Sequence, residues 1–209
     1  MELRDVIQKR ASVRHFNSDA VPEEHLREMV RLAGLAPSVN NSQPWKFIVI
    51  TNRELLRKMA DTVHSAVETR IPICDNEAEK HARAQVEWFS TFFGEAPAVI
   101  AVAQCPYTAI VDSALEHSNM THEDINALRG HPDIESVGAA VEHIILAAVD
   151  MGYGACWLSG PLIARESLEE QLGLCDSWCL AAMVAVGKPE HDVLQKEKKP
   201  IEEIFELRS

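Results

Sequence analysis

The chain has 209 residues, of which 46% are hydrophobic and 25% are charged, and its formal net charge at pH 7 is −12. This length and composition predict one globular domain with a sizeable core. The acidic balance disfavours nucleic acid as a general partner, because phosphate binding requires a basic surface. No apolar run approaches the roughly 18 residues of a membrane span, and the first residues lack the apolar region of a signal peptide. We therefore expect a soluble, cytoplasmic protein.

Five elements are predicted before residue 95. A short helix is expected over residues 2–10, and Pro22 opens a second helix with apolar residues at helical spacing. The strand Phe47–Ile50 follows, and Thr51–Glu54 matches a capping box that begins a third helix. Residues 77–93 are predicted to form a fourth helix, which ends in a group of aromatic residues.

Three more strands are predicted after residue 95. Ala98–Ala103 is apolar throughout, which is typical of a central strand, and Ala155–Leu158 and Cys179–Val186 are the other two. A helix over 136–151 is apolar nearly all round, so we expect either its own domain or a partner subunit to bury it. Arg165–Leu172 is a short helix. This order predicts an α+β fold around a small central sheet.

The segment 106–133 is polar and shows no clear periodicity. It contains three histidines, but His117 and His122 are five residues apart, not the three or four that place ligands on one helical face. We therefore predict a lid or surface insertion within a single domain over 1–209, and no metal site.

The five cysteines are odd in number and irregularly spaced. Disulfides are disfavoured in a cytosolic chain, and no two close pairs occur together as in a zinc or iron–sulfur site. We expect mostly buried thiols.

Basic residues occur near both ends of the chain. Arg10 and Arg14 flank Ser12 at the end of the first predicted helix, and Lys196 and Lys198 follow the last strand. Basic residues at a helix end can complement the helix dipole, but this does not account for the serine. Arginine forks and a hydroxyl together suit phosphate oxygens. The two ends are either separate solvated patches or they converge on one phosphate.

The segment Ala36–Trp45, which we call the amide loop, contains three side-chain amides and no charge. Each amide offers both a donor and an acceptor, which suits the edge of a planar heteroaromatic ring. Asn, Ser and Pro are also the usual residues of a turn. The loop alone leaves both interpretations open.

A third segment, Gly152–Pro161, contains glycines without the spacing of a dinucleotide fingerprint. It could be only a helix end and a strand. Alternatively, Ser159 and Gly160 would let a main-chain N–H approach a ligand closely, because glycine has no side chain in the way.

Together these segments resemble the nitroreductase family of flavin mononucleotide (FMN) enzymes, from Arg10 to Pro200. The resemblance implies a nitroreductase-like fold with a mixed or antiparallel sheet of about four or five strands. It also implies an intertwined homodimer with two flavin sites at the interface.

The resemblance assigns three groups of residues to the flavin and no catalytic side chain, because flavin carries the chemistry. The segment with Arg10, Ala11, Ser12 and Arg14 would contact the ribityl phosphate, and Lys198, or Lys196, would stand where the family often has an arginine. Pro37, Ser38, Asn41 and Gln43 would lie against the ring bound by the second subunit, and Leu158, Ser159 and Gly160 near flavin N5.

The implied activity is a ping-pong oxidation of NAD(P)H with reduction of a nitroaromatic or quinone-like acceptor. Alternatives on the same scaffold are an enoate, a free flavin or a halogenated aromatic as acceptor, or a flavin-binding redox sensor without turnover.

Overall fold

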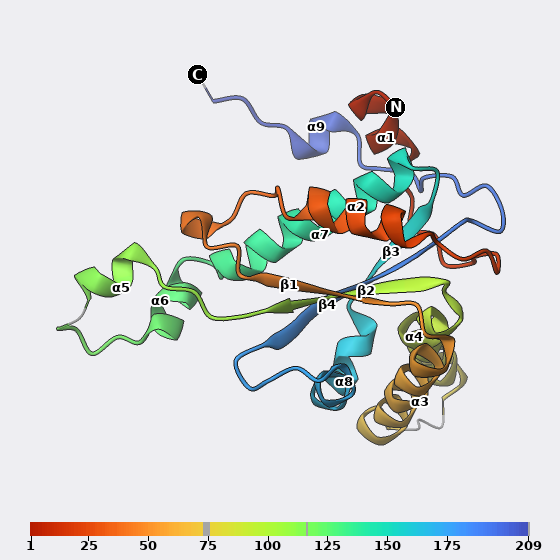
Figure 1. The fold of residues 1–209 in the computed structure, drawn as a ribbon, viewed down its shortest axis with the longest axis horizontal. Coiled ribbons are helices and arrows are strands. Elements are labelled where there is room, and N and C mark those ends of the chain that lie inside the picture. The colour runs from red at the N-terminus through yellow and green to blue at the C-terminus, as the bar shows by residue number, and fades with distance from the viewer. Residues whose placement is uncertain (73–75, 116, 209) are drawn as a thin grey trace.

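A computed structural model of the chain describes residues 1–72, 76–115 and 117–208. Four strands form one sheet in the order β1-β2-β4-β3, with every neighbouring pair antiparallel (Figure 1). The strands are β1 (Trp45–Ile50), β2 (Ala98–Gln104), β3 (Gly154–Leu158) and β4 (Cys179–Gly187). The predicted α+β class and the small central sheet are confirmed.

Helices cover both faces of the sheet. They are α1 (Leu3–Lys9), α2 (Glu23–Ala33), α3 (Arg53–Arg70), α4 (Glu77–Thr91), α5 (Ile110–Ala114), α6 (His122–Leu128), α7 (Pro132–Asp150), α8 (Arg165–Leu172) and α9 (Ile201–Ile204), with short 3-10 turns η1 (Val39–Asn41), η2 (Phe92–Glu95) and η3 (Gly160–Ala164). In Figure 1, α2 and α7 lie on one side of the sheet and α3, α4 and α8 on the other. No helix in the described ranges is long and apolar enough to cross a membrane.

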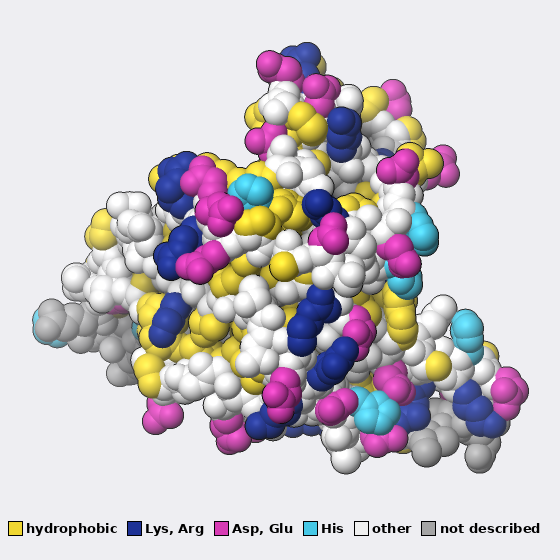
Figure 2. Space-filling view, turned by 45° about the vertical axis from the view of Figure 1, so that its right-hand side comes forward, with side chains coloured by type: hydrophobic (Ala, Val, Ile, Leu, Met, Phe, Trp, Pro, Cys, Tyr) yellow, Lys and Arg dark blue, Asp and Glu magenta, His cyan; other side chains and the backbone are white. Residues whose placement is uncertain are grey.

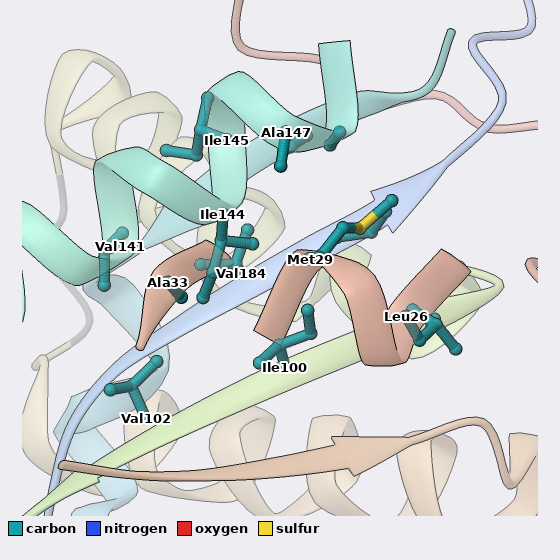
Figure 3. Packing of buried hydrophobic residues seen from close by; sticks show 14 of the residues in the cluster. Leu26, Met29, Ala33, Ile100, Val102, Val141, Ile144, Ile145, Ala147 and Val184 are labelled. Carbon is teal, nitrogen blue, oxygen red and sulfur yellow. The ribbon is translucent and has the colours of Figure 1, made fainter. Parts of the chain in front are cut away.

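Strand β2 is buried on both faces, as its unbroken apolar sequence predicts. Ile100 and Val102 pack with α2 and α7 (Figure 3), whereas Val99 and Ala101 belong to the cluster on the opposite face. Alternate residues of a strand point to opposite faces, so each cluster receives every second side chain. Fully burying one such aliphatic side chain stabilises the fold by about 1.5–3 kcal/mol.

The predicted capping box at the start of α3 is wrong by one residue. Asn52, and not Thr51, caps the helix, because its Oδ1 accepts hydrogen bonds from the backbone N–H groups of Glu54 (3.0 Å) and Leu55 (3.1 Å). A short amide side chain at this position satisfies two of the free N–H groups of the first turn.

Helix α7 is buried mainly by its own chain. It begins at Pro132, four residues earlier than predicted, because proline fits the first helical position. The helix packs against α1, α2 and strands β2, β3 and β4. The sequence left two explanations for this apolar helix, burial by its own domain or by a partner subunit. The contacts within the chain account for its burial, so a partner subunit is not required.

The segment predicted as a lid contains α5, α6 and the first residues of α7, and the two short helices project beyond one end of the sheet (Figure 1). Buried polar groups hold its base. Asn126 Nδ2 donates to Asp133 Oδ1 at 2.9 Å, Gln104 donates to the other oxygen of Asp133, and the Tyr107 hydroxyl donates to Asn126 Oδ1 at 3.3 Å. A lid function stays a prediction.

The expectation of mostly buried thiols is wrong for the cysteines that the structure describes. Cys156 is buried and Cys105 half-buried, whereas Cys175 and Cys179 are exposed, and all four are free. The two exposed thiols lie in the loop after α8 and at the first residue of β4, where the sheet ends. Cys74 lies outside the described residues.

Candidate functional site

The segment after α1, which carries Ser12 and Arg14, is extended rather than helical. Helix α1 ends at Lys9, Ser12 forms a parallel bridge with Ala155, and the N–H of Val13 donates to the Ala155 carbonyl at 3.0 Å. Burial alternates along the segment: Ala11 and Val13 are buried and Ser12 is exposed.

This alternation places Arg10, Ser12 and Arg14 on one side of the segment, which we call the basic ridge. At about 3.3 Å per extended residue, the Cα atoms of Arg10 and Arg14 are roughly 13 Å apart. Ala11 turns its side chain to the core, so only its backbone faces the ridge. Ser12 and Arg14 therefore lie on an extended segment beyond the end of the helix, and Arg14 Nη1 donates back along it to the Ser12 carbonyl at 3.4 Å.

The two ends of the chain converge at Arg10, as one of the two sequence interpretations requires. Gln195 Nε2 donates to the carbonyl oxygens of Ile7 (2.9 Å) and Arg10 (2.6 Å). Lys196 and Lys198 follow directly and are exposed. Sequence reasoning missed Gln195, because a neutral amide in a charged segment gives no distinct signal.

A cavity of about 320 Å³, which we call the ring cavity, lies at the Arg14 end of the ridge. It is lined by Arg14, Val86, Phe89, Ser90, Phe92 and the run 156–160. It therefore joins Arg14 to the predicted residues Leu158, Ser159 and Gly160. The residues from α4 were missed as site residues, although their aromatic group is visible in the sequence.

The Arg14 guanidinium lies over the Phe89 ring, 5.1 Å from the centroid. Such a cation–π contact holds the arginine without neutralising its charge. At the buried Cys156 thiol, desolvation raises the pKa, and this outweighs the opposing influence of Arg14 and Ser12. The thiol in the cavity wall is therefore protonated at neutral pH and a poor nucleophile.

Gly160 has a packing role in addition to the predicted one. A Cβ atom at this position would lie 2.4 Å from Oγ of Ser90, a residue that is only 1% exposed on α4. The missing side chain thus makes room for α4, which forms one wall of the ring cavity. The interpretation that it clears the way for a ligand is not needed to explain this glycine.

Replacing Gly160 with Ala should lower the free energy of unfolding by about 1–3 kcal/mol, because the new methyl group overpacks the contact with Ser90. Urea denaturation measures the loss. Gly138→Ala is the matched control, since its Cβ would meet Trp157 at an ordinary 3.6 Å. The double variant Gly160→Ala/Ser90→Gly should recover part of the stability; no recovery would contradict the assigned contact.

The amide loop has an unusual backbone. Asn40, Asn41 and Gln43 have φ values of 51°, 53° and 48°, in the left-handed region that side chains other than glycine rarely adopt. The Ser38 hydroxyl accepts from the Gln43 N–H at 3.0 Å and holds this shape. Asn41 and Gln43 remain exposed. Strain of this kind concentrates at functional sites.

A serine on helix α7 holds the amide loop through a hydrogen bond. The Ser136 hydroxyl accepts from the Val39 N–H at 3.0 Å and donates to the Pro132 carbonyl at 2.6 Å. Ser136→Ala should therefore destabilise the protein by about 1–3 kcal/mol, because it leaves the Val39 N–H without its acceptor.

Denaturation and hydrogen exchange across 38–43 measure the effect of this serine. Ser42→Ala is the matched control, because the buried Ser42 hydroxyl has no hydrogen-bond partner among the described residues. Equal exchange rates in the two variants would contradict the role of Ser136.

One chain does not bring the amide loop to the ring cavity. Pro37, Ser38 and Val39 line a separate cavity of about 310 Å³ with the first turns of α7, and the two cavities share no residue. The loop precedes β1 at one edge of the sheet, whereas the ring cavity lies after β3 at the other edge. Pro37, Ser38, Asn41 and Gln43 are thus separated from Arg14 within the protomer.

Comparison with known proteins agrees with this fold. The Nitroreductase family model matches residues 7–188. The chain belongs to the nitroreductase family. This family consists of oxidoreductases. The nitroreductase-like fold that the sequence predicts is confirmed.

Members of the family similar to this chain differ in their reactions. A BluB-like flavoprotein from Clostridium difficile 630 is 34% identical, with both chains fully covered and a TM-score of 0.89. The 5,6-dimethylbenzimidazole synthase of Rhodospirillum rubrum is 27% identical over 97% of this chain and 86% of its own. A nitroreductase with bound FMN from Desulfitobacterium hafniense DCB-2 is 20% identical, covering 100% and 99%, with a TM-score of 0.73.

Proposed function

We propose that this nitroreductase-family protein binds FMN and oxidises NAD(P)H with a nitroaromatic or quinone-like acceptor. One observation carries the proposal: the basic ridge runs from the converged chain ends at Arg10 to the ring cavity at Arg14. A phosphate-bearing, planar aromatic cofactor has its charged and aromatic ends separated in the same way.

The residues present fit FMN if its phosphate is assigned to the Arg10 end of the basic ridge and its ring to the ring cavity. Arg10, Ser12 and one or both of Lys196 and Lys198 would hold the phosphate, since they supply cations and a hydroxyl at the ridge end. The ring cavity, about 320 Å³ in volume, would take the ring rather than the whole cofactor. This assignment moves Arg14 from the phosphate to the ring.

When bound, FMN supplies the two-electron chemistry, which leaves binding and electrostatics to the protein. Val86, Phe89 and Phe92 provide apolar surface against which the ring would lie. The Arg14 guanidinium is a fixed positive charge in that cavity and would favour an anionic form of the ring.

We also propose a homodimer in which the amide loop serves the partner's flavin. Residues 201–208 form an exposed tail that carries the apolar side chains of Ile201, Ile204, Phe205 and Leu207. A groove of about 820 Å³ lies between α2 and the edge strand β1. Figure 2 shows hydrophobic atoms exposed among basic and acidic side chains on the face it presents. Exchange of the tails between two copies would cover such apolar surface.

The decisive experiment is an absorption spectrum of the purified protein, followed by anaerobic titration with NADH and NADPH. Bound FMN that is bleached by one equivalent of nucleotide and regenerated by a nitroaromatic or quinone supports the proposal. FMN that is bound but never reduced would favour a redox sensor, and a colourless protein that does not take up FMN would refute the proposal.

A second activity, formation of 5,6-dimethylbenzimidazole, is favoured by one observation. The BluB-like flavoprotein matches this chain over its full length at 34% identity, and the Rhodospirillum rubrum synthase matches at 27%. Chromatography of an aerated mixture of holoprotein, FMN and NAD(P)H would detect this product. Its absence, with acceptor reduction intact, supports the first activity.

A further inference from the structure

A second cavity of about 360 Å³ adjoins the ring cavity and shares Arg14 and Phe92 with it. We call it the side cavity. Its walls combine the aromatic rings of His15, Trp88 and Phe92 with two carboxylates. Of the residues assigned to the flavin, Arg14 and Phe92 line it. The other residues of its lining have no assigned part in holding FMN, so they are available to another ligand.

The aromatic wall of the side cavity is built from residues far apart in the chain. The ring centroids of His15 and Trp88 are 5.5 Å apart, and Trp88 stacks on Phe92 at 5.6 Å. Trp88 is nevertheless 41% exposed. A partly open cluster of this kind offers a surface on which a planar heterocycle can stack.

The two carboxylates of the side cavity differ in their partners. Glu95 pairs with Arg57 at 3.3 Å, which offsets its charge. Among the described residues, Glu190 has only the exposed imidazole of its neighbour His191 as an ion-pair partner, at 3.9 Å. Glu190 is thus the carboxylate whose charge is poorly compensated, and its two oxygens can accept hydrogen bonds from ligand hydroxyls.

Backbone pairing holds Glu190 at the rim. Its N–H donates to the His15 carbonyl at 3.0 Å, and the preceding Pro189 forms an antiparallel bridge with Phe16. The N–H of Asn17 donates to the Lys188 carbonyl at 3.0 Å. These contacts fix the backbone that carries the Glu190 side chain at the edge of the side cavity before any ligand binds.

We propose that the side cavity binds the adenosine half of NADH, with adenine on the aromatic wall and the ribose hydroxyls donating to Glu190. This rests on the proposed function, which requires a nicotinamide dinucleotide beside the flavin ring. A nitroaromatic or quinone acceptor offers no pair of hydroxyl donors to match the carboxylate. NADPH carries a 2′-phosphate in place of one hydroxyl, and Glu190 repels that charge, so the site selects NADH.

The test uses ADP-ribose and 2′-phospho-ADP-ribose as probes, because both carry the adenosine half without the reactive nicotinamide. Calorimetry on the holoprotein should show ADP-ribose binding at least about tenfold more tightly than its 2′-phosphate. Glu190→Gln should weaken ADP-ribose about tenfold and remove the preference, because it removes a charged hydrogen-bond acceptor. Asp192→Asn, an exposed carboxylate two residues further on, should change neither constant.

Tryptophan fluorescence gives a readout independent of turnover. ADP-ribose should quench the wild-type protein, and Trp88→Phe should lose most of that response. Identical binding constants in the wild-type protein and Glu190→Gln would overturn the proposal. So would tighter binding of the 2′-phosphate, which would give the deciding role to Arg14.

Steady-state rates separate this inference from the proposed function. A holoprotein that oxidises NADH and NADPH with equal kcat/KM and does not bind ADP-ribose refutes the inference and leaves the proposed function intact. A protein that binds ADP-ribose through Glu190 but oxidises neither nucleotide refutes the proposed function and leaves the adenosine site in place.

Discussion

Replacing Arg10 with Ala is expected to weaken FMN binding by roughly 10- to 150-fold. Hydrogen bonds to charged groups each contribute about 1.5–3 kcal/mol, and 1.4 kcal/mol corresponds to a factor of ten. Arg10 is the half-buried cation at the point where Gln195 ties the C-terminal segment to the end of α1. Its loss leaves the phosphate with exposed lysines, which bind as point charges without the planar fork. Titration of the apoprotein with FMN, followed by flavin fluorescence, measures the change.

Two variants test whether the effect belongs to Arg10 itself. Lys9→Ala removes the neighbouring exposed cation and should change FMN affinity less than threefold. Arg10→Lys keeps the charge without the fork and should give an intermediate loss. Thermal unfolding of each apoprotein checks the fold. A purified Arg10→Ala protein that retains full FMN would refute the assignment of the phosphate to this end of the ridge.

Removing residues 201–209 is expected to convert the proposed dimer to a monomer and to reduce FMN binding more than tenfold. The tail exposes Ile201, Ile204, Phe205 and Leu207, and burying such side chains against a partner contributes about 25 cal/mol per Å² of apolar surface. A monomer would also lack the partner's amide loop at the ring cavity. Analytical ultracentrifugation and the FMN content of the same samples measure both effects.

Point variants separate the tail's apolar contacts from its length. Ile204→Asp/Phe205→Asp should dissociate the dimer as the deletion does, whereas the neighbouring pair Glu202→Gln/Glu203→Gln should leave it intact. A monomer that binds FMN as tightly as the dimer would contradict the shared site. A dimer that survives the deletion would contradict only the role of the tail.

Patterns within single segments were sufficient to predict the four strands and the longer helices, but not the short helices α5, α6 and α9. The unbroken apolar run of β2 predicted a central strand, and the apolar residues nearly all round α7 predicted a buried helix. These predictions succeeded because an element that is apolar on every face is stable only where the rest of the fold covers it. The start of α3 was misplaced because Thr51 and Asn52 are both good caps, and only the backbone geometry selects Asn52.

The candidate site was only partly predictable. The basic segment and the run before Pro161 were marked by residue type, and the structure places Arg14 with Leu158, Ser159 and Gly160. The extended backbone that separates Arg10 from Arg14 was not predicted, since its strand-like pairing partner is Ala155, more than 140 residues away.

The sequence by itself determined the α+β class, the order of the strands and longer helices, and the residue types available for a flavin, because all of these depend on local chemistry. Only the tertiary structure decided that Gln195 ties the chain ends together, that Ser90 requires a glycine at 160, and that the amide loop lies apart from the ring cavity. The physical reason is that sheet order and long-range hydrogen bonds set the distances between residues far apart in the chain.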